Sequence, residues 1–362
     1  MRTAATLETA TPPRVAVSSF ASHVTYTCPL ACAHCCFSSS PAVRDRLHTE
    51  HIAESITQIP DSVRLVAFTG GEPFLLGRDL DGLVAAAHGR GFTTRVVTSA
   101  YWARSESKAA SRLRGLKEAG LDELSISWDD FHEEFVPFAF VKTAFHTARS
   151  LGLVAAINTV QTRQSRWTRT RLIDELGLPE DTDAILTESP INLTGRAAEK
   201  LADAGLREFR TLGPCPYVLS GPTLSAKNQL LACCGVIPNT EALVIDADFR
   251  PENLAKDLED SAESVLLNWL YLRGPYAIME YIGREFGVQV PNRREVGGNC
   301  EACSRLFNTP EIVRHLAAAL ERRRNEVSDE LALLDLLGLV GAREVQQIWR
   351  RDSIVVDTAP LI

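Results

Sequence analysis

The chain has 362 residues, of which 45% are hydrophobic and 23% charged, so it can form one large globular domain or two ordinary ones. Its net charge of −8 argues against a surface dedicated to nucleic acid, and no apolar stretch approaches the ~18 residues of a membrane helix. The N-terminus has no apolar run of the kind that makes a signal peptide. We therefore expect a cytoplasmic protein that binds neither nucleic acid nor membrane.

After a tail expected at 1–17, short β-branched runs alternate with helical stretches as far as about residue 210. Strand, helix and strand at ~30-residue intervals indicate repeated βαβ units and a parallel sheet. About six strands are counted, so a partial (β/α)6 barrel fits as well as an open doubly wound sheet. The strands are expected at 20–25, 64–69, 93–98, 123–128, 154–160 and 184–186, and helices near 49–59, 78–90, 105–119 and 137–151. In the last of these helices, Phe138, Val141, Phe145 and Ala148 recur at three- and four-residue steps, which predicts one apolar face.

The alternation is lost after about residue 213, so we place a domain boundary at 205–213. A cysteine-containing region at 211–310 and a C-terminal helical segment at 311–362 are expected to follow. Helices are expected near 253–285, 310–338 and 342–351.

Nine cysteines are concentrated in a few places, whereas cysteines that only fill space are scattered through a chain. The length of the chain and the missing signal peptide disfavour a disulfide framework, so we expect metal ligands. The cysteines are Cys28, Cys32, Cys35, Cys36, Cys215, Cys233, Cys234, Cys300 and Cys303.

The first cysteines form a CxxxCxxC motif, Cys28 to Cys35, directly after the first expected strand. Three thiolates at this spacing can bind three irons of one cubane and leave the fourth open, as a catalytic metal site requires. A zinc loop is the alternative, with His34 or Cys36 as fourth ligand. In the cluster interpretation Cys36 is expected to have a packing role.

A second motif, Gly70-Gly71-Glu72-Pro73, ends the second expected strand. Glycine permits close approach of the backbone to a ligand, and parallel α/β folds bind ligands at this edge. The Glu72 carboxylate and nearby carbonyls could hold an ammonium group. A simple turn is the alternative.

Together, the two motifs resemble those of the radical S-adenosylmethionine (SAM) superfamily. The resemblance implies a partial (β/α)6 TIM-like barrel over 18–210, with a mainly helical C-terminal extension that contains cysteines. It implies a [4Fe–4S] cluster whose open iron chelates SAM and whose electron cleaves SAM to a 5′-deoxyadenosyl radical. The cluster ligands would be Cys28, Cys32 and Cys35, the SAM amino group would contact Gly70, Gly71 and Glu72, and His34 would pack on the adenine.

Polar residues on later strands are further candidates for SAM or substrate contacts: Ser99, Ser127, Asp129, Asn158 and Glu188. Ser127 and Asp129 have period-2 spacing, so they project to one side, which we expect to be the barrel interior. Capping of a helical turn is the alternative for Asp129. Core packing or loop capping is the alternative for Asn158 and Glu188.

The later cysteines, Cys215, Cys233-Cys234 and Cys300-x-x-Cys303, offer five thiols for a four-ligand site, either an auxiliary iron–sulfur cluster or a zinc. Neighbours in an extended chain point to opposite sides, so one of Cys233 and Cys234 is expected to ligate while the other faces elsewhere. The spare thiol is either a small buried hydrophobe or a redox-active group.

A narrower resemblance covers about residues 20–310. The segment from Cys32 to Pro41, the Gly-Gly-Glu motif, the paired cysteines and Cys-x-x-Cys-x-x-Leu-Phe-Asn are similar to those of YydG-type radical SAM peptide epimerases. The resemblance implies that Cys234 returns hydrogen to a peptide radical, and that an auxiliary [4Fe–4S] cluster is bound by Cys215, Cys233, Cys300 and Cys303.

The reaction that this resemblance implies is L-to-D epimerisation of a ribosomally made precursor peptide. The expected partners are that peptide and an electron donor such as flavodoxin or ferredoxin. The alternatives are a radical SAM maturase that forms crosslinks or thioethers and a non-catalytic iron–sulfur or zinc protein.

Overall fold

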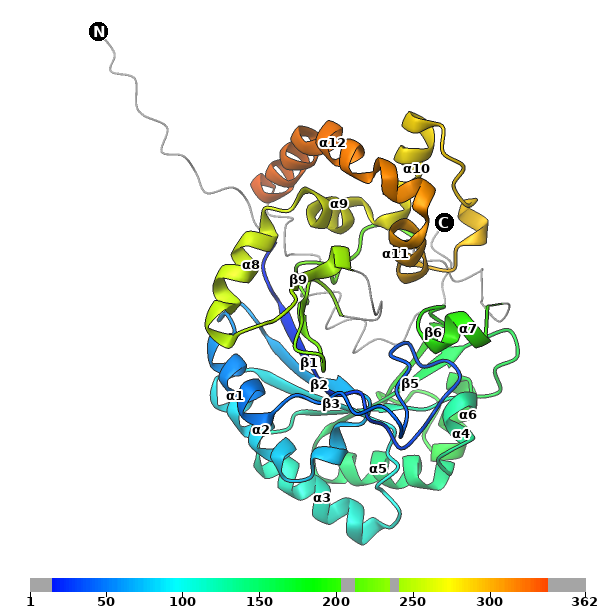
Figure 1. Cartoon of the computed structure of the whole chain (residues 1–362). Coiled ribbons are helices and arrows are strands. Elements are labelled where there is room, and N and C mark those ends of the chain that lie inside the picture. The colour runs from blue at the N-terminus through cyan, green and yellow to red at the C-terminus, as the bar shows by residue number, and fades with distance from the viewer. Residues whose placement is uncertain (1–14, 203–211, 235–240, 338–362) are drawn as a thin grey trace.

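The computed structural model describes residues 15–202, 212–234 and 241–337, and its centre is one nine-stranded sheet (Figure 1). The strands are β1 (Ser19–Thr25), β2 (Leu65–Gly70), β3 (Thr93–Thr98), β4 (Glu123–Ser127), β5 (Val154–Gln161), β6 (Ile185–Pro190), β7 (Thr223–Leu224), β8 (Leu230–Leu231) and β9 (Val244–Asp246). Their order is β6-β5-β4-β3-β2-β1-β7-β8-β9. Strands β1 to β6 pair in parallel with their chain neighbours, which confirms the predicted parallel sheet.

Helices connect these strands and cover the outer face of the sheet, as Figure 1 shows for α1, α2, α3 and α5. The helices of this part are α1 (Thr49–Gln58), η1 (Pro73–Leu76), α2 (Asp79–Gly89), α3 (Glu106–Glu118), α4 (Asp130–Glu133), α5 (Phe138–Ser150), α6 (Arg169–Leu176) and α7 (Arg196–Lys200). The predicted apolar face of α5 is confirmed, since Val141, Phe145 and Ala148 are buried along it.

Alternation along the strands separates the core from the interior of the partial barrel. Leu124, Ile126 and Trp128 belong to the large core between the sheet and its helices. Ser125 and Ser127 therefore point to the opposite, inner face. Because the carboxyl ends of parallel strands share one edge of a sheet, the loops after β1 to β4 meet there.

Beyond the parallel strands, the chain extends the sheet and then forms a helical layer with a second hydrophobic core. Strand β7 pairs in parallel with β1, and β8 and β9 follow antiparallel. The sequence pattern does not predict these strands, because two or three residues are too short to show periodicity. The remaining helices are η2 (Glu241–Leu243), η3 (Pro251–Asn253), α8 (Leu254–Ala262), α9 (Val265–Arg273), α10 (Pro275–Phe286), η4 (Arg293–Glu295), α11 (Asn299–Asn308) and α12 (Pro310–Leu336).

The later helices agree with the predicted helical regions at 253–285 and 310–338, although the first region is divided into α8, α9 and α10. The helix predicted at 342–351 and most of the tail at 1–17 lie outside the described residues. Within the described ranges, no helix is both long enough and apolar enough to cross a bilayer. The predicted boundary at 205–213 falls largely on undescribed residues and stays a prediction.

Candidate active site

The CxxxCxxC cysteines lie in the loop that follows β1, which backbone hydrogen bonds hold in shape. The Cys28 N–H donates to the Ser40 carbonyl at 3.2 Å, and the Cys35 N–H donates to the Cys32 carbonyl at 3.2 Å. The Ser39 N–H donates to Cys35 Sγ at 3.3 Å, so a backbone donor already faces one sulfur. Cys28 and Cys32 are buried, and Cys35 is half-buried.

Electrostatic interactions show that these three thiols face one another. Burial and the charge of Glu72 raise the pKa of Cys28 to about 12, with a further contribution from Cys35. Burial and the charge of Asp129 raise the pKa of Cys32, and Cys28 and Cys35 add to that shift. Because ligation requires thiolates, the group that fits here must bring positive charge to offset burial and mutual repulsion. The irons of a cluster meet this requirement.

The Gly-Gly-Glu loop at the end of β2 packs directly on the backbone that leads into the cysteine loop. The Gly71 N–H donates to the Thr25 carbonyl at 2.6 Å, and the Glu72 N–H donates to the Thr27 carbonyl at 3.0 Å. A Cβ on Gly70, whose φ is +118°, would lie 2.4 Å from Thr25 O, and one on Gly71 would lie 2.2 Å from Thr27 O. Only glycine therefore permits this approach of the two loops.

Glu72 is fully buried, and four hydrogen bonds fix its carboxylate. Oε1 accepts from Thr98 Oγ1 at 2.8 Å and from the Phe74 N–H at 3.2 Å, while Oε2 accepts from the Ser99 hydroxyl at 2.6 Å and from its N–H at 2.9 Å. Burial raises the pKa of Glu72, although the hydrogen bonds from Ser99 oppose the shift. The structure thus joins Ser99 to Glu72, and direct contact of either residue with SAM stays a prediction.

Asp129 follows β4 and has the capping role that was the alternative for it, while its contact with SAM or substrate stays a prediction. It is the N-cap of α4, because its Oδ1 accepts the N–H groups of Phe131 at 3.0 Å and His132 at 3.1 Å. The same carboxylate lies 2.8 Å from His132 Nδ1 and 3.3 Å from His34 Nε2. Capping therefore orients a buried carboxylate toward two imidazoles, one of them inside the cysteine loop. Sequence analysis did not count His132 among the candidates, although its position three residues after Asp129 gave a signal.

Burial and charge set the protonation of this group. Burial alone would raise the pKa of Asp129, but the charge and hydrogen bonds of His132 and the charge of His34 outweigh it and lower that pKa to about 2. Burial lowers the pKa of His34 to about 4, against the opposing effect of Asp129. A neutral His34 therefore lies beside the Asp129 carboxylate at pH 7, with 3.3 Å between His34 Nε2 and Asp129 Oδ2. Its ring stacks on Phe131 at 4.7 Å, and its Nδ1 has no hydrogen-bond partner among the described residues.

The ligand atoms of His34, Asp129 and His132 all lie within 4.8 Å of one another, so a metal ion is an alternative occupant. The 2.8 Å between His132 Nδ1 and Asp129 Oδ1 is a hydrogen-bond distance. Nitrogen and oxygen ligands of one tetrahedral ion, each about 2.1 Å from it, lie about 3.4 Å apart. The arrangement is that of a hydrogen-bonded triad.

The remaining candidates, Ser127 and Asn158 on the inner face of the sheet and Glu188 on β6, have neighbours within the fold. Ser127 ends β4 opposite Asn158 in the β4–β5 register. Asn158 Nδ2 donates to Ser125 Oγ at 2.7 Å. Glu188 Oε1 accepts the N–H of Arg169, the first residue of α6, at 2.7 Å. These bonds agree with the alternatives of core packing for Asn158 and capping for Glu188, and SAM contacts of all three stay predictions.

The later cysteines are brought together from three segments of the chain. Cys233 and Cys303 belong to the second hydrophobic core, and Cys215 packs against it. Burial and the charges of Cys234, Cys215 and Cys303 raise the pKa of Cys300 well above its usual value. Buried thiols that repel one another as thiolates again fit a group with positive charge. None of the nine cysteines, all within the described ranges, is in a disulfide.

Cys36 and Cys234 lie between the two cysteine groups. Burial and the charges of Cys35 and Cys234 raise the pKa of Cys36. Cys36 in turn contributes to the raised pKa of Cys300. The two groups are therefore neighbours in space, although about 180 residues of sequence separate them. Cys36 and Cys234, whose charges act on neighbouring thiols here, belong to neither predicted ligand set.

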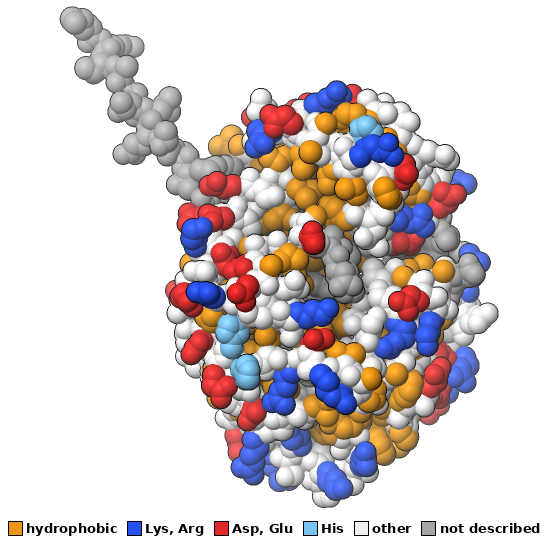
Figure 2. All heavy atoms as spheres, viewed as in Figure 1, with side chains coloured by type: hydrophobic (Ala, Val, Ile, Leu, Met, Phe, Trp, Pro, Cys, Tyr) orange, Lys and Arg blue, Asp and Glu red, His pale blue; other side chains and the backbone are white. Residues whose placement is uncertain are grey.

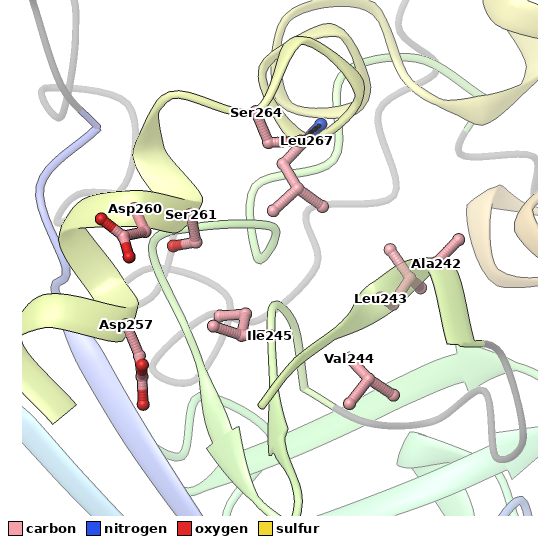
Figure 3. Close-up of a pocket in the computed structure, with 9 residues that line it drawn as sticks. All are labelled: Ala242, Leu243, Val244, Ile245, Asp257, Asp260, Ser261, Ser264 and Leu267. Atoms are coloured by element: carbon pink, nitrogen blue, oxygen red, sulfur yellow. Dashed lines mark hydrogen bonds between the residues drawn. The ribbon is translucent and has the colours of Figure 1, made fainter. Parts of the chain in front are cut away.

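Two cavities lie away from these groups. One, of about 280 Å³, is formed by η2, β9, α8 and α9, with Asp257 and Asp260 on one side (Figure 3). The other, of about 490 Å³, follows β5 and is lined by residues of 162–164 and 199–202. Neither contains a predicted site residue.

The face of the molecule in Figure 2 carries acidic and basic side chains that alternate over short distances. No single charge dominates this face, which gives no electrostatic direction to a strongly charged partner.

Comparison with known proteins places these motifs in context. Residues 22–179 match the model of the radical SAM superfamily. The chain is 22% identical over 315 residues to "Putative peptide biosynthesis protein YydG" of Bacillus subtilis (strain 168). The aligned region covers 83% of this chain and 95% of that protein. The solved structure of native anSMEcpe with bound AdoMet and Cp18Cys peptide is 13% identical in sequence and superposes with a TM-score of 0.51. The alignment covers 87% of this chain and 99% of the anSMEcpe chain.

A second solved structure, Streptococcus suis SuiB bound to S-adenosylmethionine, is 15% identical in sequence and has a TM-score of 0.49. The alignment covers 82% of this chain and 76% of the SuiB chain. At such identities a structural likeness shows the fold alone. The predicted α/β fold with a mainly helical C-terminal part is confirmed. The match of residues 22–179 to the superfamily model confirms the predicted resemblance, and the superfamily implies SAM and one [4Fe–4S] cluster as cofactors.

Proposed function

We propose that this chain, whose residues 22–179 form a radical SAM domain, converts an L-residue of a ribosomally made precursor peptide to the D-residue. The similarity to YydG over most of both chains supports a peptide as substrate. The observation that carries the epimerisation is the position of Cys234, a thiol between the two cysteine groups that neither predicted ligand set requires.

The first group would hold the SAM-binding cluster through Cys28, Cys32 and Cys35. When bound, cluster and SAM supply one-electron chemistry that yields a 5′-deoxyadenosyl radical able to remove a Cα hydrogen atom. Gly70 and Gly71 let this loop pack on the backbone that leads into the cysteine loop, and the Gly-Gly-Glu segment held in this way would contact the SAM amino group.

Cys234 would complete the reaction by giving its thiol hydrogen atom to the opposite face of the planar Cα radical. A new C–H bond forms, the S–H bond breaks, and a thiyl radical remains on Cys234. One proton and one electron, the latter from a donor of the flavodoxin or ferredoxin class, restore the thiol. Because either face of the radical can be quenched, the position of the donor decides the product.

The second group would hold an auxiliary [4Fe–4S] cluster through Cys215, Cys233, Cys300 and Cys303. Cys233 and Cys303 are buried in the second hydrophobic core and Cys215 packs against it, while the charges that raise the pKa values of Cys300 and Cys303 include those of Cys215 and Cys234. The choice of Cys233 as the ligand and of the half-buried Cys234 as the hydrogen donor rests on the resemblance to the YydG-type enzymes.

A pair of variants tests this assignment, with the anaerobically reconstituted protein and peptides translated from any short open reading frames that adjoin its gene. We expect Cys234→Ala to keep the iron content of both clusters and to release 5′-deoxyadenosine without forming a D-residue. Cys233→Ala, the matched control, should lose about half of the iron. D-residue formation by Cys234→Ala, or loss of iron from that variant, would contradict the proposal.

A further inference from the structure

Arg196, the first residue of α7, makes an unusual set of contacts with the CxxxCxxC loop, more than 150 residues away in sequence. Its Nη1 donates to the Cys32 carbonyl at 2.8 Å, and its Nη2 donates to the carbonyls of Ser38 and Ser39, both at 2.8 Å. Its backbone N–H donates to the Cys35 carbonyl at 3.0 Å. One residue thus binds four carbonyls of the loop that carries the three predicted ligands.

The residue before Arg196 makes this approach possible. Gly195 has φ +54°, and a Cβ there would lie 2.2 Å from the Cys36 carbonyl oxygen and 2.9 Å from that of Cys35. Any other residue would push α7 away from the loop. Gly195 and Arg196 therefore act together, the first by allowing contact and the second by making the hydrogen bonds.

The guanidinium also places a permanent positive charge beside the ligands. Its Nη1 lies 2.8 Å from the carbonyl oxygen of Cys32, and its Nη2 lies 2.8 Å from the carbonyls of Ser38 and Ser39 in the same loop. A fixed cation near a cluster stabilises the reduced, more negative state and so raises the reduction potential. Arginine suits the double role, because its planar fork can reach several acceptors while the charge remains.

We infer that Arg196 is a positioning residue of the SAM-binding cluster: it fixes the carbonyls of the ligand loop from outside and supplies a cation beside the cluster. The inference rests on the proposed ligand role of Cys28, Cys32 and Cys35.

The test uses the reconstituted full chain and two measurements of the SAM-binding cluster. The first is the rate of iron release to a chelator, taken from the kinetic phase that added SAM slows. The second is the reduction potential of the cluster whose EPR signal changes when SAM is added. Arg196→Gln should release this iron roughly 10- to 100-fold faster, the usual effect of losing a partner that orients metal ligands. Its cluster potential should shift to more negative values. Arg196→Lys keeps the charge but loses the fork, so it should release iron faster while its potential stays near that of the unmodified protein.

Arg90 provides a matched control, because its guanidinium also donates to three carbonyls, those of Ile56, Thr57 and Ile59, between α1 and α2. Arg90→Gln should lower thermal stability and leave iron release and potential unchanged. Arg196→Gln with unchanged release and potential would overturn the inference. If Arg196→Gln is insoluble, the Arg196→Lys variant tests the inference instead. Unchanged iron release in Arg196→Lys would also overturn the inference. Absence of a SAM-sensitive cluster in the unmodified protein would refute the proposed function instead.

Discussion

Substitution of Gly71 by alanine tests the close approach of the Gly-Gly-Glu loop to the cysteine loop. The added Cβ would lie 2.2 Å from Thr27 O, whereas ordinary contacts of a Cβ begin at 3.4 Å, so the two backbones must separate by about 1.2 Å. The nearest atoms are all backbone, so no side chain can yield by rotation. A misplacement of about 1 Å can reduce a rate by about 10²-fold. We expect a loss of this order in SAM cleavage.

The assay is 5′-deoxyadenosine release by the reduced, reconstituted protein at saturating SAM, with iron content as a second readout. Gly82→Ala is the matched control, because Gly82 lies within α2 and an added Cβ there meets no atom within 4 Å. It should stabilise the helix by roughly 1 kcal/mol and leave SAM cleavage unchanged. Cleavage by Gly71→Ala at the rate of the control would refute the reasoning that this contact positions the cofactor.

Three further predictions concern the buried groups. Cys32→Ala should abolish 5′-deoxyadenosine release and lower the iron content, and release at a normal rate would exclude Cys32 as a ligand. Asp129→Asn puts an amide where a carboxylate accepts hydrogen bonds from His132 and from backbone N–H groups and lies 3.3 Å from His34 Nε2, so it should cost about 2–3 kcal/mol in urea unfolding. An unchanged midpoint would contradict this. Burial lowers the pKa of His23 to about 4, so the unfolded state binds a proton first as pH falls. The contribution of His23 to the free energy of unfolding therefore drops by about 2 kcal/mol from pH 7 to pH 5. His23→Gln should remove this part of the pH dependence of unfolding in the apo-protein, and an unchanged pH dependence would show that His23 does not cause it.

The sequence predicts the parallel half of the fold well, because its strands and helices are long enough to show periodicity. The strand at 93–98 is confirmed at both ends, and the apolar face of α5 is confirmed as well. The motif loops are found at the carboxyl ends of β1 and β2, as parallel topology requires. Elements of about one helical turn or of two or three strand residues, such as α4 and β7, are too short to show periodicity in the sequence.

Long-range contacts explain what the sequence does not predict about the site. Asp129 has the predicted capping role, and its carboxylate also lies beside two imidazoles, one of which comes from the distant cysteine loop. The hydrogen bonds of Ser99 to Glu72 connect two strand ends that the sequence treats separately. The role of Arg196 has no sequence signal, since its acceptors are backbone carbonyls, which every residue carries.

The mass of the peptide product formed in D₂O tests the proposed epimerisation most directly. Because the hydrogen of a thiol exchanges with solvent, each turnover that ends at Cys234 should add one deuterium to the peptide and convert one L-residue to the D-residue. The same reaction in H₂O should leave the peptide mass unchanged. A product that has lost two hydrogen atoms, or one that has gained no deuterium and retains only L-residues, would contradict epimerisation through Cys234.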